Sequence, residues 1–181
     1  LELNDRAAKA AYSLGNFWYA ARQYDCAIEC WETSVAICPD FPTVWRNLSL
    51  AYYNKQDNKA KALEALEKAF RLDENDSRIL MELDQLYKRL GYSHERRLAF
   101  LENHLSTTEE RDDLAIERIT LYNQLGRYDE AKALIAGRKF HPWEGGEGKI
   151  TGQYVLCRVE LARVALREQR YADALALLEE T

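Results

Sequence analysis

The sequence is poor in the residues that interrupt helices, since 181 residues contain only three prolines and eight glycines. It also has almost none of the strict apolar–polar alternation that marks half-buried strands. It consists instead of 47% hydrophobic and 30% charged residues, with Ala, Leu, Glu, Arg and Lys abundant. Because these residues favour helices, the composition predicts an all-α protein.

Long apolar runs are absent as well. No stretch approaches the roughly 18 apolar residues of a transmembrane helix, and the first residues, LELNDRAAKA, lack the apolar centre of a secretory signal. The net charge of −5 argues against a basic surface for nucleic acid or a membrane. We therefore expect a soluble, cytoplasmic protein with protein or peptide partners. The sequence starts and ends inside helical patterns, so we expect a fragment of a longer protein.

Residues that could hold a metal or a cofactor are few and badly spaced. Cys26 and Cys30 lie one helical turn apart, but no second pair of cysteines or histidines completes a tetrahedral zinc set. The segment GGEGK suggests a phosphate-binding loop, but Trp143 replaces its first glycine and Ile150 its magnesium-binding Ser or Thr. We expect reduced cysteines, no metal, no cofactor and no catalytic residue.

The stretch from Leu14 to Asp40 predicts two short helices packed as an antiparallel pair. Ala11, Leu14 and Trp18 follow one another in steps of three and four residues, so they share one helical face. On the second helix a small residue, Ala27, stands where two backbones must approach closely. The residues assigned to the core of this pair are Leu14, Trp18, Ala27 and Trp31.

This pattern recurs along the chain and resembles the tetratricopeptide repeat (TPR), whose consensus has similarly placed aromatic, Leu-Gly, Ala and Pro positions. The resemblance implies a right-handed superhelical α-solenoid of about five helix hairpins, the last one truncated, in a single array over residues 1–181. The expected repeats are residues 8–41, 42–76, 77–106, 107–137 and 152–181, with a loop at 137–151. This arrangement predicts nine complete helices and a tenth that is cut short.

The third repeat departs from the pattern in its second helix. In the third repeat Arg96 or Arg97 takes the place of the small alanine, so the helices there must meet differently. Thr107 and Glu110 then stand at the spacing of a capping box, in which a hydroxyl and a carboxylate satisfy the first backbone amides of a helix. That spacing predicts a helix start at Thr107.

In proteins with this repeat the concave surface is built by first-helix residues that lie off the core stripe. The resemblance places tyrosine, amide and cationic side chains there, a composition that suits a peptide with carboxylates and a few apolar anchors. A solvated helical face without a ligand is the alternative. The predicted concave-face residues are Lys9, Tyr12, Asn16, Tyr19, Arg46, Tyr53, Asn54, Arg78, Gln85, Lys88, Asn123, Arg163 and Arg167.

Some members of the family grip the acidic C-terminus of a chaperone with a carboxylate clamp. Its two asparagine positions correspond here to Asn16 and Asn47, and one of its cationic positions to Arg78. However, Tyr12 stands where the clamp has a lysine and Glu82 where it has another cation. Because a negative charge at Glu82 would repel a ligand carboxylate, the clamp is the less favoured interpretation.

The glycine-rich loop at 137–151 has two interpretations. Phe140 and Trp143 could fill the gap between two repeats while the glycines close the turn. Alternatively, the loop contacts a partner or ligand through its polar and aromatic residues: Arg138, Lys139, His141, Trp143, Glu144 and Lys149. The phrase FHPWEGGEGK is also similar to the C-terminal repeat region of large bacterial proteins whose preceding domain has a carbohydrate-related role.

The sequence thus predicts a non-catalytic scaffold that binds a protein, a peptide or another domain of its own parent chain on its concave face. The alternative is an accessory module of a larger bacterial, glycan-active enzyme, with the loop at 137–151 contributing to a site. Self-association through the apolar face of the truncated last repeat is a further expectation.

Overall fold

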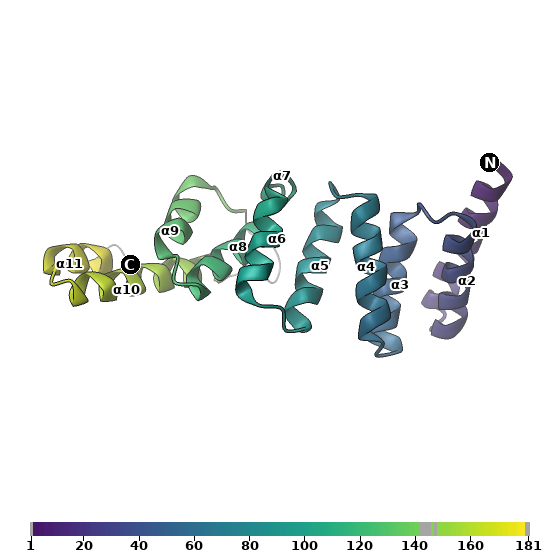
Figure 1. The fold of residues 1–181 in the computed structure, drawn as a ribbon, viewed down its shortest axis with the longest axis horizontal. Coiled ribbons are helices and arrows are strands. Elements are labelled where there is room, and N and C mark those ends of the chain that lie inside the picture. The colour runs from purple at the N-terminus through teal and green to yellow at the C-terminus, as the bar shows by residue number, and fades with distance from the viewer. Residues whose placement is uncertain (1, 142–145, 147, 180–181) are drawn as a thin grey trace. The chain divides into compact units, whose positions relative to one another are not determined.

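The computed structural model describes residues 2–141, 146 and 148–179, which form eleven α-helices and no strand (Figure 1). The chain divides into two compact units, residues 1–90 and 91–181, and each is described by itself. The expected all-α fold built of helix hairpins is confirmed. Within the described residues, no helix is both long and apolar enough to cross a membrane.

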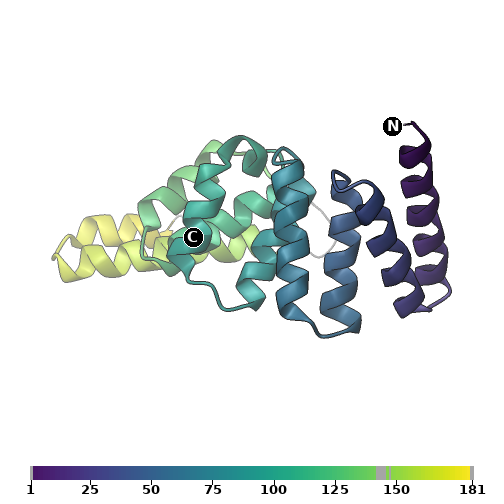
Figure 2. The ribbon, with the colours of Figure 1, turned by 45° about the vertical axis from the view of Figure 1, so that its right-hand side comes forward.

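The first unit contains two helix hairpins and one further helix. The helices are α1 (Glu2–Ala20), α2 (Tyr24–Ile37), α3 (Pro42–Lys55), α4 (Lys59–Leu72) and α5 (Ser77–Arg89). In Figures 1 and 2 they lie side by side in chain order, α1 packed against α2 and α3 against α4. Pro42 begins α3 at a position where its missing N–H costs nothing, and Asn58 and Asp76 cap α4 and α5 with their side-chain oxygens.

The core of this unit is built around small residues at the helix contacts. Ala27 and Ala62 are fully buried, and Trp31 and Leu48 fill the space beside them, as the stripe predicts for Ala27 and Trp31. The assignment of Leu14 to the core is wrong, because its side chain is 48% exposed. The face of α1 that meets α2 instead carries Ala8 and Gly15, so the predicted stripe lies beside the contact face.

The helices of the second unit are more uneven in length, from 5 residues in α7 to 19 in α10. They are α6 (His94–Asn103), α7 (Leu105–Glu109), α8 (Asp112–Gln124), α9 (Tyr128–Gly137), α10 (Lys149–Arg167) and α11 (Tyr171–Glu179). The short α7 is the helix that the sequence pattern did not predict. On α11 the side chains of Tyr171, Leu175 and Leu178 are exposed, so the self-association expected there stays a prediction.

The capping box predicted at Thr107 and Glu110 is wrong. Thr107 lies inside α7, and the next helix starts only at Asp112. Thr108 is fully buried and its hydroxyl donates to the Leu101 carbonyl at 3.0 Å, so this segment closes the end of α6 rather than opening a helix. The arginine expected at the small-residue position is Arg97, which is 1% exposed and donates to Glu117 on α8 at 2.7 Å.

One contact recurs at a fixed interval and links the second helix of one hairpin to the first helix of the next. The Tyr52, Tyr87 and Tyr122 hydroxyls donate to Glu32, Glu67 and Glu102, at 2.6, 3.1 and 2.7 Å. Members of each set follow one another at intervals of 35 residues. Burial and the hydrogen bond to Glu32 raise the pKa of Tyr52 well above its ordinary value, so the hydroxyl stays protonated and keeps donating. We call these contacts the tyrosine–glutamate ladder.

Candidate functional site

Two adjoining pockets lie on the first helices of the first unit, and they share Leu50. The pocket over α1 and α3 has a volume of about 230 Å³ and is lined by Asn16, Tyr19, Ala20, Trp31, Asn47 and Leu50. The pocket over α3 and α5 has a volume of about 210 Å³ and is lined by Ser49, Leu50, Tyr53, Asn54, Leu66, Met81, Glu82, Gln85, Leu86 and Arg89. We call the two pockets together the inner groove.

Close packing beneath the groove holds its walls in place. A Cβ atom on Gly15 would lie 2.4 Å from the Trp31 ring, so only glycine lets α1 approach α2 at this point. On α3 the buried Ser49 hydroxyl donates to the Ala62 carbonyl at 2.7 Å. These contacts fix which side chains of α1 and α3 face the groove.

An amide network runs along the floor of the first pocket. Asn16 Oδ1 accepts hydrogen bonds from Trp31 Nε1 at 3.2 Å and from Asn47 Nδ2 at 3.4 Å. The Asn16 side chain is thereby oriented, and within the described part of the chain its Nδ2 group donates to no residue. The groove therefore presents the Asn16 Nδ2 group as a hydrogen-bond donor in a fixed orientation. Such a group can donate to a peptide carbonyl.

Three further polar groups of the groove have no hydrogen-bond partner among the described residues. They are the hydroxyls of Tyr19 and Tyr53 and the side-chain amide of Gln85, carried by α1, α3 and α5 in turn. The Tyr53 ring is half-buried and lies 5.6 Å from the Arg89 guanidinium. The groove thus offers uncharged donors and acceptors at intervals beside apolar walls.

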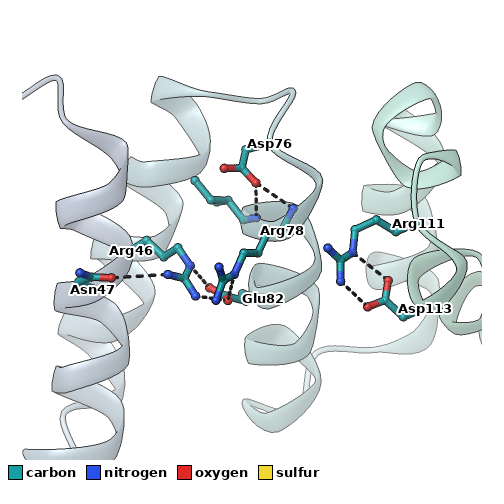
Figure 3. A network of polar contacts seen from close by, with 8 residues as sticks. Arg46, Asn47, Asp76, Arg78, Glu82, Arg111 and Asp113 are labelled. Carbon is teal, nitrogen blue, oxygen red and sulfur yellow. Dashed lines mark hydrogen bonds and ion pairs between the residues drawn. The ribbon is translucent and has the colours of Figure 1, made fainter. Parts of the chain in front are cut away.

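An ion-paired cluster adjoins the second pocket through Glu82, and Figure 3 shows its side chains. Arg46 donates to both oxygens of Glu82, from Nε to Oε2 at 2.6 Å and from Nη2 to Oε1 at 2.5 Å. Arg78 Nε donates to Glu82 Oε1 at 3.3 Å, and Arg46 Nη1 lies 3.5 Å from Asn47 Oδ1. Arg46 and Glu82 are nearly buried, at 14% and 15% exposed, whereas Arg78 is 62% exposed. We call Arg46, Glu82 and Arg78 the arginine–glutamate triad.

Most of the predicted concave-face residues of the first unit lie at this groove. Asn16, Tyr19, Tyr53, Asn54 and Gln85 line its pockets, and Arg46 and Arg78 belong to the triad. The other three predicted residues lie outside the pocket linings: Tyr12 packs against Phe41, Lys9 pairs with Asp5, and Lys88 is exposed.

The predicted residues of the second unit do not share such a groove. Asn123 is only 4% exposed, and its Nδ2 donates to the backbone carbonyl and the side chain of Gln153 on α10, at 3.1 and 2.9 Å. Its assignment to a ligand-facing surface is therefore wrong, because this side chain joins α8 to α10. Arg163 pairs with Glu160 and Arg167 is exposed. A pocket of about 630 Å³ between α9, α10 and α11 includes neither arginine.

The described part of the loop after α9 is fastened to the start of α8. Arg138 donates to Asp112 Oδ1 at 2.8 and 2.6 Å, and the His141 backbone N–H donates to Asp112 Oδ2 at 2.8 Å. Burial acts to raise the pKa of Asp112, but the hydrogen bonds from His141 and Arg138 outweigh it and hold the pKa below its usual value. Arg138 also lies 5.7 Å from the Phe140 ring.

The structure describes only some of the other loop residues that were predicted to contact a partner. Lys149 is the first residue of α10 and is exposed, while Trp143 and Glu144 lie outside the described residues. Among the residues that the structure describes, no three His, Cys, Asp or Glu side chains gather as metal ligands would. The four cysteines are free, and burial raises the pKa of the Cys157 thiol.

Sequence reasoning missed several groove residues. Ser49, Leu66, Leu86 and Arg89 line the second pocket, although none of them was predicted to face a ligand. Arg89 could have been found, because it follows Gln85 by one helical turn and so shares its face. Leu66 could not, because it belongs to a second helix and reaches the groove only through packing.

No protein-family model matches the sequence. Among solved structures, the chain is similar to MamA, with 13% identity, a TM-score of 0.62, and coverage of 96% of this chain and 88% of that chain. It is also similar to YrrB, described as a TPR protein with an unusual peptide-binding site, with 15% identity, a TM-score of 0.64, and coverage of 98% and 86%. A third similar structure is the first TPR of Spaghetti (RPAP3) bound to the HSP90 peptide SRMEEVD, with 19% identity, a TM-score of 0.56, and coverage of 67% and 95%.

Proposed function

From the fold that this chain shares with TPR proteins, we propose that it is a non-catalytic interaction scaffold. Its first unit binds an extended segment of a partner protein in the inner groove. The observation that carries the proposal is the row of uncharged polar groups, from Asn16 and Tyr19 on α1 through Tyr53 on α3 to Gln85 on α5, beside two pockets with apolar walls.

The polar groups suit the backbone of an extended peptide. Successive carbonyl and N–H groups of such a peptide recur every few ångströms, and amide and hydroxyl side chains can both donate to and accept from them. The apolar part of the second pocket, formed by Leu50, Met81 and Leu86, suits one anchoring side chain of the ligand. Binding energy then comes from an anchor in a pocket, with the polar contacts fixing direction.

The similar structures support this proposal through what their descriptions say of those proteins. YrrB is described with a peptide-binding site, and the first TPR of Spaghetti is described bound to a heptapeptide. Both are tetratricopeptide-repeat folds at a TM-score above 0.5.

The test is a selection of random heptapeptides on the whole chain by phage display, followed by calorimetry with the enriched peptides. Tyr53→Ala removes an aromatic wall of the groove and is expected to weaken binding at least tenfold, since aromatic residues dominate such contacts. Gln85→Ala is expected to weaken it by about threefold, the effect of one uncharged hydrogen bond. The matched control is Tyr171→Ala, which removes an exposed tyrosine of α11.

Equal affinity of the enriched peptides for the chain, Tyr53→Ala and Tyr171→Ala would place the binding site elsewhere and refute the inner groove. Failure to enrich any peptide would refute it as well. The heptapeptide SRMEEVD is a useful reference ligand in the same assay, because its sequence combines apolar anchors with carboxylates.

A further inference from the structure

We propose that Glu82 is the specificity-determining residue of the inner groove. It serves as an internal carboxylate for Arg46 and Arg78, so the groove accepts uncharged segments with an apolar anchor and gains little from carboxylates on the ligand. This inference rests on the proposed function, namely that the inner groove binds a peptide.

The geometry shows that Glu82 already makes the contacts that a ligand carboxylate would seek. Its two oxygens receive two parallel N–H groups from Arg46, which is the strongest arrangement available to an arginine and a carboxylate. A third N–H, from Arg78, completes the set. Figure 3 shows the contacts of both guanidinium groups with Glu82 as dashed lines.

A free ligand competes poorly with a side chain that is already in place. A tethered group acts as if it were present at roughly millimolar concentration or above, because its translational freedom is lost in advance. Arg46 and Glu82 are also 14% and 15% exposed, so displacement would leave a nearly buried carboxylate without its partner. A ligand carboxylate would therefore have to overcome both effects.

One cation of the triad does face the solvent, and its effect is limited. Arg78 is 62% exposed, and the triad as a whole carries a net charge of +1 from two arginines and one glutamate. An exposed ion pair in water contributes only about 0–1 kcal/mol, so Arg78 gives acidic ligands at most a few-fold advantage. The pockets beside it are lined by neutral amides, hydroxyls and apolar side chains, which define the preferred ligand.

The experiment compares two matched peptides by calorimetry. SRMEEVD with a free C-terminus carries four carboxylates, and SRMQQVN with an amidated C-terminus replaces each of them by an amide of nearly the same shape. For the unmodified chain we expect the two affinities to agree within about threefold, the limit that an exposed cation sets. For Glu82→Gln we expect SRMEEVD to bind at least tenfold more tightly than SRMQQVN.

Three further variants make the result specific. Glu64→Gln on α4 changes the net charge by the same amount at an exposed position and is expected to give no such preference. The double variants Glu82→Gln with Arg46→Ala and Glu82→Gln with Arg78→Ala are expected to lose most of the gain. Glu82→Ala, which admits water beside the arginines, replaces Glu82→Gln if circular dichroism shows that the glutamine variant does not fold.

The outcomes separate the inference from the proposed function. If Glu82→Gln shows no preference for SRMEEVD but still binds the display-selected peptides, Glu82 does not set specificity and the groove assignment stands. If Glu82→Gln prefers SRMEEVD but Tyr53→Ala weakens the binding of no peptide, the two arginines of the triad bind a ligand carboxylate once Glu82 is removed, and the proposed binding of peptides in the inner groove is wrong. If the unmodified chain already prefers SRMEEVD tenfold, or if no variant binds any peptide, the inference is wrong.

Discussion

In the first unit Ala27 and Ala62 are fully buried at helix contacts, whereas 35 residues after Ala62, in the second unit, the buried residue is Arg97. Alanine lets two backbones approach closely, and its side chain has no polar group that needs a hydrogen-bond partner. A buried guanidinium must be paired, and Arg97 is paired with Glu117 on α8. At this position of the repeat the two units therefore pack in two ways, the first through a small side chain and the second through a buried ion pair.

The same contrast extends to other contacts. Arg158 in α10 is 2% exposed and donates to the Ala176 and Leu177 carbonyls near the end of α11. Arg138 fastens the loop after α9 to Asp112. In the first unit the nearly buried ion pair, Arg46 with Glu82, lies instead at the edge of the inner groove. Ion pairs and charged hydrogen bonds thus fasten several helix contacts of the second unit, whereas in the first unit an ion pair borders the candidate site.

The largest effect is expected from Arg97→Ala. The substitution removes a buried guanidinium together with its ion pair to Glu117 and opens a cavity, so the second unit should lose about 3–5 kcal/mol of unfolding free energy. Urea unfolding followed by circular dichroism measures the loss. Replacing both partners, as Arg97→Met with Glu117→Leu, should restore most of it, and the exposed Arg163→Ala is the control. A loss below about 1 kcal/mol would show that charge is not what holds this contact.

Gly15→Ala tests the role of shape in the first unit. Alanine favours a helix over glycine by about 1 kcal/mol, but its Cβ would lie 2.4 Å from the Trp31 ring. Overpacking of this kind costs about 1–3 kcal/mol, so we expect a net destabilisation of the first unit. Unfolding in urea is again the measurement. Unchanged or raised stability would mean that α1 and α2 do not need close approach.

Asp112→Asn tests a charged contact of the second unit through pH. The pKa of Asp112 is lowered in the folded chain, so its contribution is complete above the unfolded value of about 4 and disappears as pH falls through the lower folded value. The variant should therefore be about 1.5 kcal/mol less stable at pH 7 and approach the unmodified chain in acid. The exposed Asp129→Asn is the control. A difference that does not vary with pH would contradict the assignment.

Gly152→Ala is expected to have the smallest effect and the opposite sign to Gly15→Ala. Gly152 lies inside α10, and a Cβ atom there would meet nothing within 4 Å. The substitution should raise the melting temperature through helix propensity alone, by the equivalent of about 0.5–1 kcal/mol. Destabilisation would show that glycine serves close packing in the second unit as well.

The sequence predicted buried positions correctly only where helical spacing and helix packing agree. The spacing of Ala27 and Trp31 fixed their shared helical face, and both are buried as expected. Leu14 follows an equally regular spacing and is exposed. Periodicity shows which residues share a helical face, but it does not show whether another helix packs against that face. The groove residues Tyr53 and Gln85 could be placed because the resemblance to the repeat assigns off-stripe positions of first helices to the concave surface.

Errors arose where one pattern can serve two structures. Thr107 and Glu110 have the spacing of a helix start, but the segment packs as the short helix α7 at the end of α6. From the sequence alone, Glu82 was expected to repel acidic ligands as a free charge. In the structure it forms an ion pair with Arg46, a residue 36 positions away. Such pairing is decided by how neighbouring hairpins stack, which local spacing does not encode.

The tyrosine–glutamate ladder bears on how the array comes apart. In a repeat protein each hairpin is stabilised by itself and by coupling to its neighbour, and the coupling decides whether the hairpins unfold together. Each rung joins one hairpin to the next, from Glu32 to Tyr122. The next positions, 35 residues further on, are Cys157 in place of the tyrosine and Gly137 in place of the glutamate, and these two residues cannot form the contact. Amide hydrogen exchange should therefore begin in α10 and α11, whereas within each unit the helices that a rung joins should open together.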